Sequence, residues 1–235
     1  MRERLKTLLK GQGTPVLQTC DASGETIISA ANIWTSAHGR RIELRGVGLG
    51  RGDVLASSLG GFQAIVDFVA CAIGGFIYLP LSPEALAMLR AEPFAPAGGA
   101  GIMLVAEGLE PRHHEGVLPA RLHGAVRTPG ALLVLLGESE PRTFTAVAIE
   151  ARLAALQAKL RTRDGATRLS YDACHNDMAL IDDLLLGLFN RQTIHLRRGE
   201  GLNAAQMLAE AGRLEAEELA VSGENLDLPG LRAMA

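Results

Sequence analysis

From about residue 50 to the C-terminus, short apolar segments alternate with segments of helical rhythm. The clearest apolar segment, residues 131–136 (ALLVLL), has no polar position, as is typical of a strand buried on both faces of a parallel sheet. A strong helical segment follows at 147–160. Strands that alternate with helices are joined by βαβ crossovers. The sequence therefore predicts an α/β fold: a doubly wound, mostly parallel sheet with helices on both faces.

The remaining elements follow from periodicity and from helix-start and turn signals. Strands are expected at 15–20, 25–29, 54–57, 76–79, 102–106, 193–196 and 219–222, and helices at 2–10, 30–37, 62–73, 83–90, 178–190 and 204–214. Residues 110–128 show no clear period and are expected to be irregular. We expect one domain over 1–235, with a small αβ extension over 1–45 as the alternative.

Composition excludes several classes of function. The net charge is −3 and only three residues are lysine, which argues against nonspecific nucleic-acid binding. Three dispersed cysteines indicate a reducing compartment rather than a disulfide framework. The N-terminus has no apolar signal segment, and the longest apolar stretch, 62–81, is interrupted by polar residues and glycines. A cytoplasmic protein without membrane or nucleic-acid contacts is the expectation.

A stretch of about forty residues, RGVGLGRGDVLASSLGGFQAIVDFVACAIGGFIYLPLSPE, carries a family resemblance. Its Gly52-Asp53-Val54 turn, its paired glycines Gly74 and Gly75 and its Pro80-Leu81 resemble the N-terminal subdomain of the AMP-forming adenylate-forming superfamily. That superfamily includes acyl-CoA synthetases, peptide-synthetase adenylation domains and luciferase-like enzymes. The resemblance implies the α/β fold of that subdomain.

Two further stretches extend the resemblance at low identity. The segment ALLVLLGESEPRTFTAVAIEARLAAL has the shape of the family's strand, phosphate loop and helix. In the segment 170–196, His175 falls where many members carry a histidine beside the acyl pocket, so the resemblance implies a substrate-binding role for His175. The tail, 204–234, resembles the next helix, strand and helix.

The phosphate loop departs from the family pattern T-S-G-S-T-G-x-P-K-G. The family's glycines let backbone N–H groups approach the phosphates, and its lysine supplies positive charge. Here Phe144 replaces the lysine and Thr145 the last glycine, while Glu138 and Glu140 add negative charge. The hydroxyl and cationic groups left for a cofactor in this degenerate loop are those of Ser139, Arg142, Thr143 and Thr145.

The chain also shows none of the family's later motifs: the adenine pocket, the ribose-binding aspartate and the C-terminal catalytic lysine. We therefore expect a noncatalytic or accessory homologue, a pseudoenzyme without catalytic residues of its own, that binds an acyl ligand or a protein partner in an acid-activating or acyl-transfer pathway. The alternative is an ATP-dependent acid–thiol ligase completed by a second subunit. The resemblance implies ATP and Mg²⁺ as cofactors, but the altered loop argues against their binding.

Expected partners follow from the same hypothesis. An apolar surface that the rest of a ligase would cover favours a homo-oligomer or a partner subunit. Arg197-Arg198 is compatible with contact to an acidic carrier protein, although a solvated strand end is the simpler interpretation.

Four other clusters admit a chemical and a structural interpretation. The glycine run 46–52 fails the dinucleotide fingerprint and is interpreted as a tight surface loop. Cys174-His175 is compatible with a pocket wall, with a nucleophile and base, or with a metal site that includes neighbouring aspartates. His113-His114 is interpreted as an exposed polar loop. Asp182-Asp183 diverge by ~100° on a helix, which favours a solvated helix start over a catalytic pair.

Overall fold

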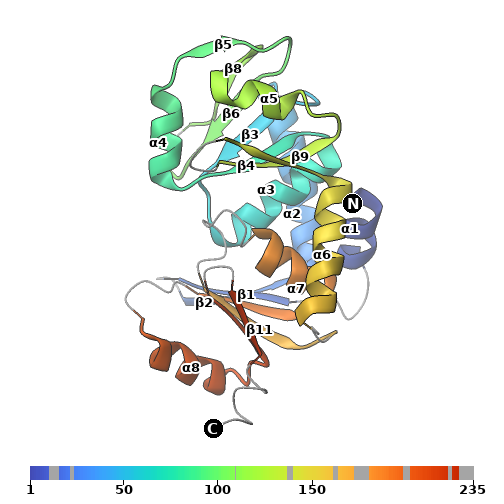
Figure 1. Ribbon diagram of the computed structural model, residues 1–235, viewed down its shortest axis with the longest axis vertical. Helices are drawn as coiled ribbons and strands as arrows, with labels where there is room; N and C mark the ends of the chain where they lie inside the picture. Colours follow the sequence, from blue (N-terminus) through green and yellow to red (C-terminus); the bar gives the residue numbers. More distant parts are fainter. Residues whose placement is uncertain are drawn as a thin grey trace. The chain divides into compact units, whose positions relative to one another are not determined.

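The computed structural model describes residues 1–10, 16–21, 24–108, 110–136, 140–160, 164–171, 180–197, 202–221 and 224–227 (Figure 1). Its contacts group into two compact units. Unit 1 comprises residues 1–5 and 33–150, and unit 2 comprises residues 6–32 and 151–235. The expectation of a single domain stays a prediction, and each unit is described by itself.

Unit 1 is built on a six-stranded sheet with the order β10-β9-β4-β3-β6-β7. Its four inner strands, β9 (Ala131–Leu135), β4 (Ile77–Pro80), β3 (Val54–Ser57) and β6 (Ile102–Val105), are parallel. The edge strands β10 (Arg142–Thr145) and β7 (Arg112–His114) are antiparallel to their neighbours. A short ribbon of β5 (Phe94–Pro96) and β8 (Val117–Pro119) is separate from this sheet.

Helices cover both faces of the unit 1 sheet. On one face, α4 (Pro83–Ala91) and α5 (His123–Val126) pack on alternate residues of the strands, such as Ala56 and Leu79. On the other, α3 (Gly61–Gly74) contacts the sheet through Phe68, whose ring meets Tyr78 edge-on at 6.2 Å between centroids. Since successive residues of a strand face opposite ways, each buried strand must be apolar throughout.

The helix ends of unit 1 follow from local chemistry. Ser82 caps α4, because its hydroxyl accepts a hydrogen bond from the Ala85 N–H at 3.1 Å and Pro83 occupies the first helical position. Helix α3 stops at Gly75, which adopts φ +78°, a conformation that glycine reaches without strain. A Cβ at Gly74 would lie 2.5 Å from the Phe76 ring, so the turn into β4 requires glycine there as well.

Unit 2 repeats this arrangement with the order β14-β13-β11-β12-β1-β2. Its inner strands β13 (Glu218–Val221), β11 (Thr167–Tyr171), β12 (Thr193–Arg197) and β1 (Val16–Asp21) are parallel. The edges β14 (Glu224–Asp227) and β2 (Gly24–Ser29) are antiparallel. One face packs on α8 (Ala204–Arg213), through Leu169 and Ala211. On the other face, strand residue Arg168 bonds to Asp183 of the π-helix Leu180–Leu185, which continues as α7 (Leu186–Phe189).

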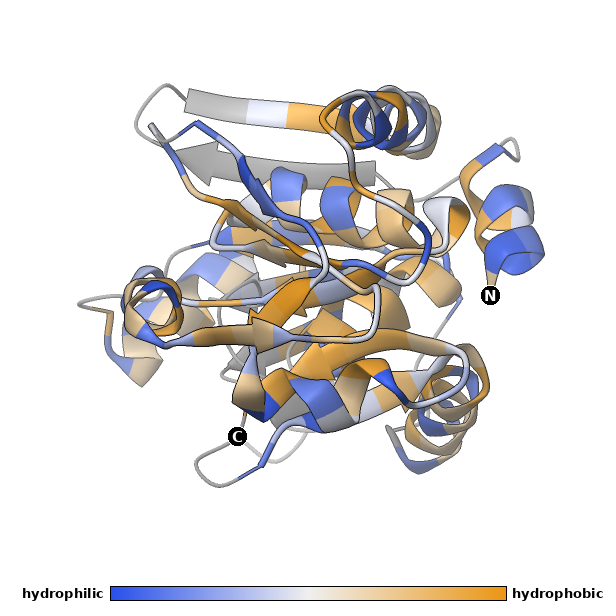
Figure 2. Cartoon of the chain, turned by 90° about the horizontal axis from the view of Figure 1, so that it is seen from above, coloured by the Kyte–Doolittle hydropathy of each residue, from blue (hydrophilic) through white to orange (hydrophobic). Residues whose placement is uncertain are grey.

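The predicted fold class is confirmed: parallel inner strands with helices on both faces of each sheet, and apolar strands inside (Figure 2). The structure has two such sheets where the sequence predicted one. Three helices, α1 (Arg2–Lys10), α2 (Ala30–Gly46) and α6 (Ala146–Leu160), contribute residues to both units. No helix in the described part of the chain is long and apolar enough to cross a membrane.

Two predictions of local structure are wrong. The helix expected at 30–37 is longer, because α2 continues past Gly39 to Gly46. A helix tolerates an interior glycine at a cost of about 1 kcal/mol, and Arg40 in the later part of α2 donates a hydrogen bond to Asp67 of α3. Residues 110–128 are not irregular: they form β7, β8 and the short helices Ala120–Leu122 and His123–Val126. Each of these elements has three or four residues, which is too short for a periodicity to show.

Candidate functional site

The segment that resembles a phosphate loop is a β-hairpin at one edge of the unit 1 sheet. Strands β9 and β10 pair antiparallel from Leu135 opposite Arg142 to Leu133 opposite Phe144, with a bulge before Thr145. Helix α6 begins directly after β10. The predicted order of strand, loop and helix is therefore present, and the sequence did not reveal the second strand.

Three of the predicted cofactor-binding residues, Arg142, Thr143 and Thr145, lie on strand β10. Arg142 is exposed and Thr143 is half-buried. Thr145 lies at the start of α6, where its hydroxyl accepts a hydrogen bond from the Ala148 N–H at 3.2 Å. Such a bond satisfies one of the N–H groups that a helix start leaves without an intrahelical partner. Thr145 thus has a structural role at this position.

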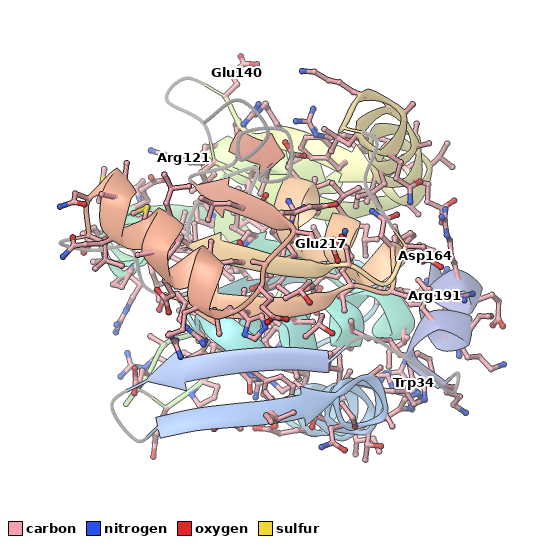
Figure 3. The ribbon with its side chains drawn as sticks, turned by 90° about the horizontal axis from the view of Figure 1, so that it is seen from below. Trp34, Arg121, Glu140, Asp164, Arg191 and Glu217 are labelled. Atoms are coloured by element: carbon pink, nitrogen blue, oxygen red, sulfur yellow. The ribbon has the colours of Figure 1, made fainter. Side chains whose placement is uncertain are left out.

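The charges around the hairpin differ from those of a phosphate site. Glu140 is exposed, and its side chain points away from the ribbon (Figure 3). Phe144, half-buried on β10, supplies no charge where the family's lysine would. Arg142 is the one cationic residue among the described hairpin residues 131–136 and 140–145. The predicted residues Ser139, in this loop, and His175, together with Glu138, lie outside the described residues.

The glycine run before β3 is a tight turn, as predicted, and its structure opposes phosphate binding. Asp53 is buried there, and its carboxylate accepts hydrogen bonds from the N–H groups of Gly50 and Gly101, both at 2.7 Å. A carboxylate therefore already occupies the backbone donors that an anion would need. Gly48 and Gly52 have φ of +98° and +88°, which explains glycine at both.

The interpretation of His113-His114 as an exposed loop is wrong, because both residues lie in strand β7 and are half-buried. They do face opposite ways. His113 Nε2 lies 3.4 Å from an Asp53 carboxylate oxygen, whereas the His114 ring stacks on Phe94 at 4.6 Å between centroids. The pairing with Asp53 connects β7 to the turn before β3.

A buried polar cluster at the carboxyl end of β3 was missed from the sequence. Asp67 of α3 is fully buried and accepts hydrogen bonds from Arg40 Nε at 2.9 Å, Ser57 Oγ at 2.8 Å and Gln63 Nε2 at 3.1 Å. Burial lowers the pKa of Arg40, but the charge of Asp67 and the hydrogen bonds to Asp67 and Glu43 outweigh it, so the guanidinium pKa is raised. Arg40 and Asp67 thus neutralise each other's charge. In the sequence, the one sign of this cluster is Asp67, an acidic residue inside the apolar stretch 62–81.

This cluster borders a pocket of about 590 Å³ at the carboxyl ends of β3 and β6. Ligands of open α/β sheets bind outside the carboxyl ends of strands. The charged side chains that line it are Arg40, Glu43 and Glu107. Because Arg40 is already paired with two carboxylates, the pocket is poorly suited to an anion.

In unit 2, the predicted solvated helix start at Asp182-Asp183 is wrong, since both side chains are buried. They diverge, as expected, and pair with different arginines. Arg152 donates to Asp182 from Nε at 2.6 Å, and the fully buried Arg168 donates to Asp183 from Nη2 at 3.0 Å. Burial raises the pKa of Asp183, and the nearby Arg168 offsets this only in part.

Arg197 is also not the solvated strand end that the sequence indicated. Its Nε lies 3.0 Å from Oε1 of Glu210 in α8, and its side chain is buried. The Tyr171 hydroxyl donates to the other oxygen of Glu210 at 2.5 Å. Arg198 and the Cys174-His175 pair lie outside the described residues. Within the described segments, no group of three or more His, Cys, Asp or Glu side chains is placed to hold a metal ion.

Comparison with known proteins gives a consistent result for the fold. No family model matches the sequence, and no curated protein matches it. The structure is similar to a fatty acyl-adenylate ligase from L. pneumophila in complex with acyl adenylate and pyrophosphate, with a TM-score of 0.67 over 92% of this chain at 14% identity. The chain has the fold of part of an acyl-adenylate ligase.

Two more solved structures with this fold agree. The adenylation domain of a keto acid-selecting NRPS module bound to keto acyl adenylate gives a TM-score of 0.68 over 93% of the chain at 17% identity. MatB from Rhodopseudomonas palustris gives 0.65 over 93% at 16% identity. The chain spans 43%, 46% and 48% of these three proteins, so it matches less than half of their length. The resemblance drawn from the sequence is confirmed at the level of the fold.

Proposed function

We propose that this chain is a noncatalytic relative of the acyl-adenylate ligases that keeps their scaffold and binds an acyl ligand or a protein partner. The observation that carries this proposal is the β9–β10 hairpin. Phe144 stands where the family's lysine would supply charge, and the Thr145 hydroxyl caps α6. An ATP polyphosphate, whose binding depends on cationic and backbone N–H donors, therefore finds Arg142 as the one cationic side chain among the described residues of this hairpin.

The test is calorimetric titration of Mg·ATP into the purified chain, with AMP and a medium-chain acyl-CoA as parallel ligands. We expect no ATP binding at millimolar concentration. Binding of ATP at micromolar strength would overturn the proposal. A variant that restores the family residues, Phe144→Lys with Thr145→Gly, serves as the positive comparison, and we expect any gain of ATP affinity to appear in this variant and not in wild type.

The second candidate is an ATP-dependent acid–thiol ligase that a second polypeptide completes. Two observations favour it: Glu140 points to solvent rather than crowding a phosphate, and Arg142 is exposed on β10. Its test is pyrophosphate exchange with candidate second subunits added to the chain. Exchange that depends on both polypeptides and is lost in Arg142→Gln would support this candidate over the first.

A further inference from the structure

A second pocket lies at the opposite edge of the unit 1 sheet from the hairpin. It has a volume of about 350 Å³, within the range of small-molecule sites. Nine residues from α4, β5, β6, β7 and the turn between β6 and β7 line it: Leu86, Arg90, Phe94, Leu104, Ala106, Gly108, Glu110, Arg112 and His114. In the sheet order, β7 and β10 occupy the two edges, so this pocket is separate from the phosphate-loop position.

The pairing of β6 with β7 explains how apolar and cationic groups come to share the pocket. Leu104 is opposite Arg112, and Ile102 is opposite His114. Directly opposed residues of antiparallel strands project from the same face of the sheet. Leu104, Arg112 and His114 therefore share the face that α4 covers, where Leu86 packs.

The charged side chains that line the pocket carry a net positive charge. Arg90 and Arg112 are both exposed, and in the described part of the chain neither has an ion-pair partner, in contrast to Arg121, which pairs with Glu92 at 2.5 Å. Glu110 is the one carboxylate of the lining. Arg90 lies in the last turn of α4, where its positive charge stabilises the helix by interacting with the helix dipole. That explanation does not apply to Arg112, which comes from an edge strand.

We propose that this pocket binds a small organic anion whose charged group contacts Arg90 and Arg112. Guanidinium groups bind carboxylate and phosphate oxygens through paired, charge-assisted hydrogen bonds. The apolar part of the ligand lies against the buried Leu86 and Leu104, and its planar groups meet the wall formed by the Phe94–His114 stack. The proposal does not depend on whether the hairpin binds ATP.

The test is ligand-observed NMR titration of the full chain with benzoate and phenyl phosphate, and with benzamide as the uncharged comparison. We expect both anions to bind and benzamide to bind about tenfold more weakly, because hydrogen bonds to a charged group are the stronger ones. The two anions distinguish a carboxylate site from a phosphate site. Equal binding of benzamide, or no binding of either anion, would overturn the proposal.

Four exposed side chains provide matched variants that leave the core intact. Arg112→Gln and Arg90→Gln should each weaken anion binding about tenfold, whereas Arg51→Gln, in the exposed turn before β3 and outside the pocket lining, should leave it unchanged. Glu110→Gln should strengthen binding by up to about fivefold, since it removes a repelling charge. Circular dichroism confirms that each variant is folded. Equal loss in Arg51→Gln would indicate nonspecific attraction and contradict a built site.

Discussion

At the scale of single residues, Thr145 is a position where this chain departs from the family's phosphate-loop pattern. Where the family has a glycine that lets the backbone approach phosphate, this chain has a hydroxyl that caps α6. We predict that Thr145→Ala lowers the free energy of unfolding by about 1 kcal/mol, because the Ala148 N–H loses its acceptor. Chemical denaturation measures this change.

The matched variants are Thr145→Ser, which keeps the cap and should change stability by only a few tenths of a kcal/mol, and Thr145→Gly, whose cost at a helix start is similarly small. If the Thr145→Ala variant is as stable as wild type, the cap contributes nothing to stability. The Thr145 hydroxyl would then again be a candidate phosphate contact.

Residues also show where sequence reasoning reaches its limit. Asp182 and Asp183 were interpreted as solvated because adjacent carboxylates at a helix start usually are, yet both are buried. Their partners, Arg152 and Arg168, are 30 and 15 residues away in sequence. Pairings of that kind depend on the tertiary structure, which no local pattern encodes.

At the scale of elements, the sequence predicted those that are long or buried. Strands at 54–57 and 131–135 and helices at 61–74 and 146–160 lie within about two residues of their predicted bounds, because apolar runs and helix-start signals define them. The edge strands β7, β10 and β14 were missed. An edge strand of three or four residues is half-solvated and mixed in polarity, so it resembles a loop in the sequence.

The docking of α8 leads to a pH prediction. Burial raises the pKa of Glu210, but its hydrogen bonds to Tyr171 and Arg197 and the positive charges of Arg197 and Arg213 outweigh that effect, so the pKa is lowered overall. A carboxyl group with a lowered pKa in the folded state contributes stability above its unfolded pKa and loses that stability as the pH falls through the folded value.

We therefore predict that Glu210→Gln destabilises the protein by on the order of 1 kcal/mol at pH 7, and that the difference from wild type shrinks below about pH 4. Urea denaturation at several pH values measures it. The exposed Glu115→Gln is the control and should show no such dependence. A difference that stays constant with pH would mean that α8 is not held by the ionised carboxylate.

At the scale of the whole molecule, both units repeat one plan: four parallel inner strands, antiparallel edges and helices on both faces. Each has its own apolar cluster. The chain nevertheless crosses between the units inside α1, α2 and α6, so each of these helices belongs partly to both. If the chain forms the single domain predicted from the sequence, the two units unfold together, and calorimetry measures whether they do.

We predict one cooperative thermal transition, with calorimetric and van't Hoff enthalpies in a ratio of about one. The reason is that melting either unit alone would interrupt three helices and expose backbone N–H and C=O groups at each new end, which costs free energy in the unit that stays folded. Differential scanning calorimetry of the full chain measures the ratio. Two resolved transitions, or a ratio well above one, would show that the units unfold independently and that the chain contains two domains.

A variant that weakens the apolar cluster of unit 2, Leu219→Ala, sharpens the test. In a single domain the whole transition shifts to lower temperature. Independent units would instead shift one transition and leave the other in place.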